Sequence, residues 1–164
     1  MSSDQWNPYF LDRSPVFEPL HRVGQHLNQL EQWPTLDQLN HLLSIQKPSI
    51  QTHTHLTLRL VPQAASIQLF EQRYEPRTYL CGELQTRTHN WHDLFNALVW
   101  ITFPHSKAQL NTLHYHALKI AEKQRQSNRG RLRDAITLLD ESGVLVTSSH
   151  KNLTRLLKNF EWKT

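Results

Sequence analysis

The feature that most constrains the fold is the segment NWHDLFNALVW, Asn90 to Trp100. Asn90 is a favourable N-cap, so we expect a helix that runs from Trp91 to about Phe103 and ends at Pro104. Apolar side chains cover almost its whole circumference, which is typical of a helix buried in a core. The rest of the chain must therefore enclose this helix.

The length of 164 residues, with 38% apolar residues, suits one core of ordinary size. We expect a single domain over residues 1–164. Residues 1–19 are rich in proline and aromatic residues, which predicts an extended N-terminal arm lying over the core. Apolar spacing predicts further helices from Leu20, after the N-cap Thr35, after the N-cap Ser106 and after Ser149.

Two segments predict β-structure. In HLTLRLVP the apolar residues alternate with polar ones, which indicates a half-buried strand over residues 55–61. In AITLLDESGVLVTS two apolar runs flank a turn-like D-E-S-G, which predicts a hairpin over residues 135–147 with Gly143 in the turn. The predicted fold class is α+β, with about five helices around a small, mainly antiparallel sheet.

The polar residues at the start of helix 91–103 are the first candidate site. His92 and Asn96 are four residues apart, so they share a face, and buried polar groups need partners. They either hydrogen-bond to nearby backbone and fix the helix, or belong to a ligand site. A helix N-terminus attracts anions, and Arg87 in the preceding loop offers a bidentate clamp for a carboxylate or phosphate. Arg87, Asn90 and Asn96 are the candidate ligand-binding residues of this second interpretation.

A histidine on the next helix extends this candidate site. His114 lies in the middle of the inner apolar stripe of the helix after Pro104, and we predict that it also binds the ligand. If His92 and His114 approach each other, an acid from Asp140 or Glu141 completes either a metal site or an acid–base pair. His92, Asp140 and Glu141 are therefore the candidate catalytic residues, while we assign no metal ligands and name no cofactor.

A basic segment supplies an alternative. The net charge is +4, and the run KQRQSNRGRLR concentrates positive charge without an intervening acid. Such a cluster attracts phosphate-bearing partners, although it is also typical of a solvated helix end. The candidate contact residues for RNA, a ribonucleoprotein or an acidic protein are Lys123, Arg125, Arg129, Arg131 and Arg133.

Location follows from cysteine content and hydropathy. The single cysteine, Cys81, excludes an internal disulfide framework and suits a reducing compartment. No run approaches the roughly 20 apolar residues that span a bilayer, and no signal peptide is visible at the N-terminus. We therefore expect a cytoplasmic protein without a membrane partner.

Three stretches resemble a known family. PQAA, YEPRTYLCGELQTRTHNWHDLFNALVWITFPHSKAQLNTLH and GRLRDAITLLDESGVLV follow one another as in an uncharacterised bacterial family, domain of unknown function 3025, over roughly residues 56–162. The resemblance implies no particular activity. It maps recurring polar positions onto Arg87, Asn90, His92, Asp93, Asn96, Lys107, Asn111, Arg133, Asp134, Asp140 and Glu141. Family members continue into a further segment with a G-H-A-L stretch, so we expect this chain to lack the family's C-terminal segment.

Two functions of different class follow. The first is a small enzyme or ligand-binding protein with an anion-accepting polar pocket at the N-terminus of helix 91–103, whose ligand is an unidentified anionic small molecule. The second is a non-catalytic protein that binds its partner through the basic segment 123–133. We prefer the first, because buried polar residues need more explanation than surface charge does.

Overall fold

The computed structural model describes residues 5–66, 69–124, 130–143 and 146–161. The chain divides into two compact units, Met1–Ser127 and Asn128–Thr164, which are considered separately. The first unit contains 3-10 helices at Phe10–Arg13, Pro15–Leu20, Gln25–Leu27 and Phe70–Gln72, and the helices and strands α1 (His21–Gly24), α2 (Leu36–Ser44), β1 (Arg59–Pro62), α3 (Tyr74–Cys81), β2 (Glu83–Thr86), α4 (Trp91–Thr102) and α5 (Pro104–Lys123). The second unit contains α6 (Arg131–Ser142) and α7 (Lys151–Lys158).

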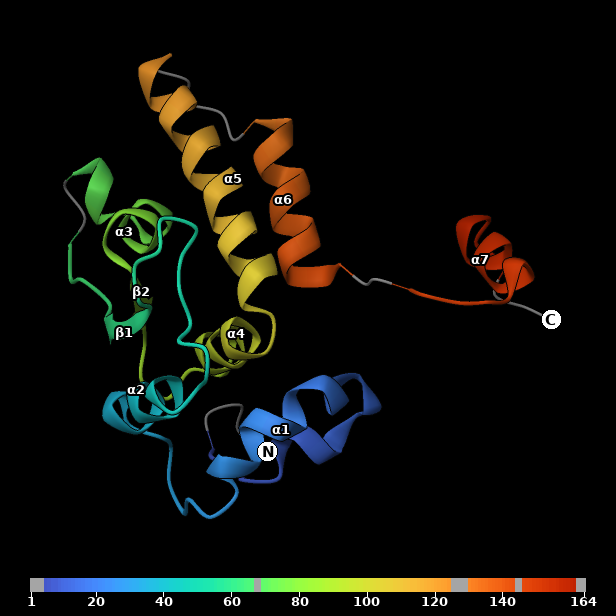
Figure 1. The fold of residues 1–164 in the computed structure, drawn as a ribbon, viewed down its shortest axis with the longest axis horizontal. Coiled ribbons are helices and arrows are strands. Elements are labelled where there is room, and N and C mark those ends of the chain that lie inside the picture. The colour runs from blue at the N-terminus through green and yellow to red at the C-terminus, as the bar shows by residue number, and fades with distance from the viewer. Residues whose placement is uncertain (1–4, 67–68, 125–129, 144–145, 162–164) are drawn as a thin grey trace. The chain divides into compact units, whose positions relative to one another are not determined.

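The predicted fold class is wrong in its sheet and in its helix count. The described residues form seven α-helices and one sheet of two parallel strands, in which Arg59 pairs with Glu83 and Pro62 with Thr86 (Figure 1). The strands are parallel because the chain crosses between them through α3, as parallel pairing requires. The predicted hairpin over 135–147 is replaced by α6, up to Ser142, and residues 144–145 of that prediction lie outside the described residues.

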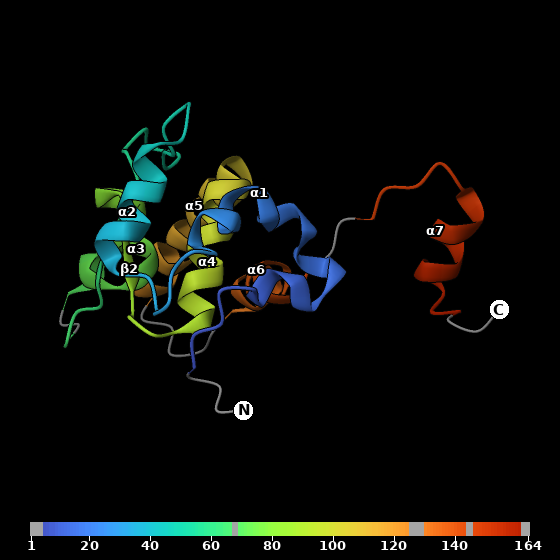
Figure 2. The same cartoon turned by 90° about the horizontal axis from the view of Figure 1, so that it is seen from below.

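The N-terminal segment is helical where an extended arm was predicted. Two 3-10 helices occupy Phe10–Arg13 and Pro15–Leu20. The second begins with Pro15, which is favourable because a residue at the start of a helical turn needs no hydrogen-bond donor. The segment packs on α4 through its aromatic rings. Trp6 stacks on Trp91 at 5.5 Å, and Phe17 lies 4.9 Å from Phe95. These rings, together with α1 beside α4 (Figure 2), cover a large part of the helix that is apolar all round.

Two local predictions, the N-caps Thr35 and Asn90, are confirmed. Thr35 caps α2 in a capping box with Gln38, and the side-chain oxygen of Asn90 accepts from the backbone N–H of Asp93 at the start of α4. The helix α3 ends at Gly82, which takes a left-handed φ of 69° that suits glycine. The predicted N-cap Ser106 is wrong, because α5 begins two residues earlier with Pro104 in its first turn.

The helix α4 lies at the centre of the first unit's core. Leu94, Ala97, Leu98 and Trp100 are all at most 3% exposed. The strands contribute Leu60 and Leu84 to the same cluster of buried residues, and α2 contributes Leu39, Leu42 and Leu43. The predicted strand residues Leu58 and Leu60 are buried as expected, whereas Leu56 is 37% exposed. The polar start of α4 is thus attached to a rigid, well-packed support.

The second unit has little interior of its own. Ile136 is its one buried apolar residue among those the structure describes. The last predicted helix exists as α7. Within the described ranges, no helix is both long and apolar enough to cross a membrane.

Candidate functional site

The start of α4 carries a clasp between Arg87 and Asp93. The guanidinium of Arg87 donates from Nε to Oδ2 of Asp93 and from Nη2 to Oδ1, both at 2.9 Å. The backbone N–H of Arg87 also donates to Oδ2, at 2.8 Å. The carboxylate of Asp93 thus reaches beyond its own helix, to the loop after β2. The clasp therefore fixes that loop against α4.

Two more predicted site residues join this network. Nδ1 of His92 lies 2.9 Å from Oδ1 of Asp93, and Asn90 caps the helix through the N–H of Asp93. The expected burial of His92 is wrong, because its side chain is 68% exposed. The side chain of His92 points away from the core, because Asp93 and Leu94 form the buried face of the first turn of α4. Arg87, Asn90 and His92 are thus brought together around Asp93.

The electrostatics of the clasp favour ionised partners. Burial alone would raise the pKa of Asp93, but hydrogen bonds from Arg87 and His92 outweigh it and lower that pKa to about 2. The hydrogen bonds and charge of Asp93 in turn raise the pKa of Arg87. The pair is therefore charged at neutral pH, and its two charges cancel.

A small hollow open to solvent lies beside the clasp. One side is polar and comes from the end of β2 and the loop to α4: Thr86, Arg87, Thr88, His89 and Asn90. The other side is mainly apolar: Trp33, Pro34, Leu36, Leu39 and Leu94. Sequence reasoning missed Trp33 and His89 as site residues. No local pattern joins them, because the contact between their rings, at 5.8 Å, connects distant parts of the chain.

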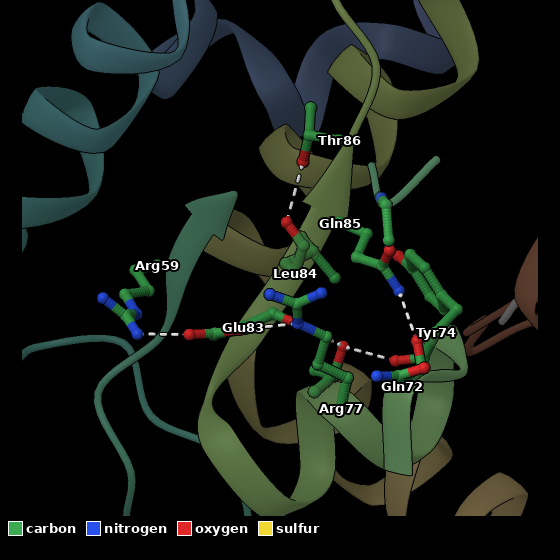
Figure 3. Close-up of polar contacts among 10 residues, drawn as sticks. Arg59, Gln72, Tyr74, Arg77, Glu83, Leu84, Gln85 and Thr86 are labelled. Carbon is green, nitrogen blue, oxygen red and sulfur yellow. Dashed lines mark hydrogen bonds and ion pairs between the residues drawn. The ribbon is translucent and has the colours of Figure 1, made fainter. Parts of the chain in front are cut away.

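The polar network of Figure 3 holds β2 in place. Glu83 lies between Arg59 on β1 and Arg77 on α3, with Nε of Arg77 at 2.6 Å. A hydrogen bond from Arg77 is the largest of the effects that lower the pKa of Glu83, and it outweighs the effect of burial. Gln85 donates to the carbonyl of Gln72 and accepts from the backbone of Ala64. These contacts support the strand whose carboxyl end leads into the hollow.

A second polar group lies where α3 meets α4 and α5. Nδ2 of Asn96 donates to the hydroxyl of Tyr74 at 2.5 Å. Nδ2 of Asn111 donates to both the backbone carbonyl and the carboxylate of Glu75. The predicted site is thus divided, since Asn96 belongs to this second group rather than to the clasp. Sequence reasoning did not select Tyr74 or Glu75, which lie in a short helix with little periodicity to reveal its inner face.

The buried face of α5 is unusually polar. Lys107, Asn111 and His114 are 7%, 3% and 7% exposed, and their spacing of four and three residues puts them on one face. The expected burial of His114 is confirmed, and the resemblance had marked Lys107 and Asn111. Oδ1 of Asn111 is buried without a hydrogen-bond partner among the described residues. The amide cannot be reversed, because Oδ1 would then face two acceptor oxygens of Glu75.

Several predicted residues belong to elements other than those that form the clasp. Asp140 and Glu141 are exposed residues near the end of α6, in the second unit. Of the basic segment, Lys123 ends α5, Arg131 and Arg133 lie in the first turn of α6, and Arg125 and Arg129 fall outside the described residues. Across the described ranges, no three His, Cys, Asp or Glu side chains form a group that could hold a metal ion.

Comparison with known proteins gives one match. Neither the curated proteins nor the solved structures contain a significant match to this chain. A family model described as protein of unknown function (DUF3025) matches residues 58–164, which include β1, β2 and all helices from α3 onward. This range confirms the resemblance found in the sequence. The chain, with the Arg87–Asp93 clasp inside the matched region, belongs to the DUF3025 family.

Proposed function

We propose that this protein binds a small molecule bearing a carboxylate or phosphate group, in the hollow at the start of α4. The half-exposed guanidinium of Arg87, which Asp93 holds by one edge, is the observation that carries the proposal. An arginine fixed in this way presents its remaining donors in a set direction, so little side-chain freedom is lost when an anion binds.

The outer edge of Arg87 is the proposed contact. Asp93 takes Nε and Nη2, while no described contact involves Nη1. The side chain is 51% exposed and lines the hollow. The amides of the first turn of α4 point toward the same end of the helix, where the helix dipole favours negative charge. These donors together suit a carboxylate or a phosphate.

Asp93 limits the strength of this site. It neutralises the charge of Arg87, so the ligand gains hydrogen bonds and the dipole of α4 but little net Coulomb attraction. We therefore expect selective contacts and modest affinity. His92 would act through Asp93, by orienting its carboxylate, and not through direct contact with the ligand.

Other predictions remain open. A catalytic role for His92 with Asp140 or Glu141 stays a prediction, as do ligand contacts by Asn96 and His114. Binding of RNA or an acidic partner by segment 123–133 and a cytoplasmic location also stay predictions. No contact among the described residues favours one of these over anion binding at Arg87.

Calorimetric titration with sodium acetate and with inorganic phosphate, at constant ionic strength, tests the proposal. The informative variant is Asn90→Asp, because aspartate caps a helix as well as asparagine does but adds negative charge to the hollow. Ser106→Asp, in the first turn of α5, is the matched control for added charge. We expect saturable binding that Asn90→Asp weakens at least about tenfold and that Ser106→Asp leaves unchanged. Equal binding by all three proteins would refute the proposed site.

A further inference from the structure

His92 has an imidazole ring that is held at one nitrogen and open at the other. Nδ1 lies 2.9 Å from Oδ1 of Asp93, and the side chain of His92 is 68% exposed. No hydrogen bond or ion pair joins Nε2 to any residue that the structure describes. We propose that Nε2 of His92 accepts a phosphoryl group from a small phosphoramidate-type donor, which makes the residue a phosphohistidine.

Asp93 determines which nitrogen of His92 is the nucleophile. Its pKa of about 2 means that the carboxylate is ionised at neutral pH, and an ionised carboxylate only accepts hydrogen bonds. Nδ1 of the neutral ring therefore carries the proton and donates to Oδ1, which leaves the lone pair on Nε2. Because most of the side chain is exposed, a donor in solution can reach that lone pair.

The carboxylate that holds His92 is itself fixed. The side chain of Asp93 is 11% exposed, and Arg87 donates to both of its oxygens. The imidazole is thus held in one orientation, whereas an unpaired histidine on the surface rotates freely. Holding the ring in advance reduces the entropy that is lost when it attacks a donor.

The charges at this end of α4 suit phosphoryl transfer. Attack on phosphorus makes the ring positive, and the carboxylate of Asp93 stabilises that charge through the N–H of Nδ1. His92 is the second residue of α4, where the helix dipole favours the negative oxygens of a phosphoryl group. Arg87 donates to the same Oδ1 that His92 contacts, so a positive charge lies on this side of the ring. An uncharged acyl group would gain nothing from the dipole or the arginine.

The step balances with phosphoramidate as the donor. The lone pair of Nε2 attacks phosphorus, and a new N–P bond forms as the bond from phosphorus to the donor's own nitrogen breaks. The electron pair of that bond leaves with the donor nitrogen, which carries three protons in the zwitterionic donor and departs as ammonia. The proton on Nδ1 stays in its hydrogen bond with Asp93. His92 does not line the hollow, so the step needs no ligand there and does not rest on the proposed function.

The test treats the full chain with potassium phosphoramidate, locates the phosphate by mass spectrometry and identifies the ring nitrogen by phosphorus NMR. His105 is the matched control, because it is an exposed histidine at the second position of α5 and has no carboxylate partner among the described residues. We expect labelling of Nε2 of His92 at least about tenfold faster than labelling of His105. In denaturing urea the two rates should become equal, because the contact with Asp93 is lost.

Asp93→Asn tests the role of the carboxylate. The side-chain amide can donate to Nδ1, which moves the ring proton to Nε2 and removes the nucleophilic lone pair. We expect the labelling rate of His92 to fall at least about tenfold, to that of His105, while the rate of His105 stays the same. Circular dichroism shows whether the variant is folded, and the comparison with urea-denatured wild type decides the question if it is not.

Three results would overturn the inference. The first is equal labelling of His92 and His105 in the folded protein, and the second is a phosphate on Nδ1 of His92. The third is a labelling rate of His92 that a folded Asp93→Asn variant leaves unchanged. None of these results depends on anion binding beside Arg87, so a failure of this inference is distinguishable from a failure of the proposed function.

Discussion

The start of α4 and the contact between α3 and α5 satisfy their polar groups in different ways. At the start of α4, Asp93 accepts hydrogen bonds from both the backbone and the side chain of Arg87, and the surrounding groups remain half exposed. At the α3–α5 contact, Asn111 is 3% exposed, and its carbonyl oxygen has no partner among the described residues. A polar group at the start of α4 can replace a lost protein contact with a hydrogen bond to water, whereas a buried polar group at the α3–α5 contact cannot. Substitutions in the second should therefore cost more.

The largest effect is expected for Asn111→Asp. The new carboxylate would face two acceptor oxygens of Glu75 and has no donor to offer them. We expect a loss of about 3 kcal/mol in the free energy of unfolding, as is typical of an unpaired buried polar group. Urea denaturation measures this. A loss below about 1 kcal/mol would show that this contact is wetter than its burial indicates.

Asp93→Asn should have the next largest effect. The amide keeps the size of the carboxylate but loses the charge that pairs with Arg87, so we expect a loss of about 2 kcal/mol at neutral pH. Arg87 stays half exposed and can turn to water, which limits the cost. Urea denaturation of the variant beside Asn111→Asp tests the predicted order of the two regions.

The stability of the wild-type protein should depend on Asp93 at acidic pH. Its pKa falls from 3.8 to about 2 in the folded protein, so the folded state favours the ionised form. The stabilisation is present above about pH 4 and is lost as the pH falls toward 2. The difference in unfolding free energy between wild type and Asp93→Asn should therefore shrink over this range. A constant difference would contradict the clasp.

Asn96→Asp should cost about 1 kcal/mol, clearly less than Asn111→Asp. Both asparagines donate to α3, but the partner of Asn96 is the hydroxyl of Tyr74, which can rotate and donate to a carboxylate. Urea denaturation of both variants compares the tyrosine hydroxyl, which can rotate and donate, with the two oxygens of Glu75, which can only accept. Equal losses would mean that the difference in partner chemistry has no consequence.

The smallest effect is expected for His92→Ala, at about 0.5 kcal/mol. Its side chain is 68% exposed, and its contact with Asp93 adds to a carboxylate that Arg87 already holds. Thermal unfolding at neutral pH checks this. A large loss would show that His92, and not Arg87, is the main partner of Asp93.

Local signals in the sequence predicted the starts of two helices correctly. Asn90 and Thr35 act through contacts within a few residues, so the sequence alone contains the information. The strand β2 escaped prediction because it buries Gln85 and Thr86 as well as Leu84, and so shows no apolar alternation. In α6 the turn-like D-E-S-G suggested a hairpin, although Leu132, Ile136 and Leu139 have helical spacing.

The candidate site was predictable only in part. The residues around Asp93 are close in the sequence, and Arg87, Asn90 and His92 were all selected. The contact between Arg87 and Asp93 was not predicted, because it depends on the direction in which the loop after β2 turns. Trp33 is distant in the sequence from the polar residues of the hollow and is brought beside them by the tertiary fold. The orientation of Asn111 depends on Glu75 in another helix. Such long-range contacts leave no periodic signal in a single sequence.

The proposed anion site is tested most directly by NMR. The side-chain N–H signals of Arg87 are recorded during titration with sodium acetate and with inorganic phosphate. Arg77 is an internal control, since its Nε also donates to a carboxylate, that of Glu83. If an anion binds beside the clasp, the Arg87 signals shift and saturate while those of Arg77 stay in place. If Arg87 does not shift, or if both arginines shift alike and without saturation, the hollow at the start of α4 is not an anion site.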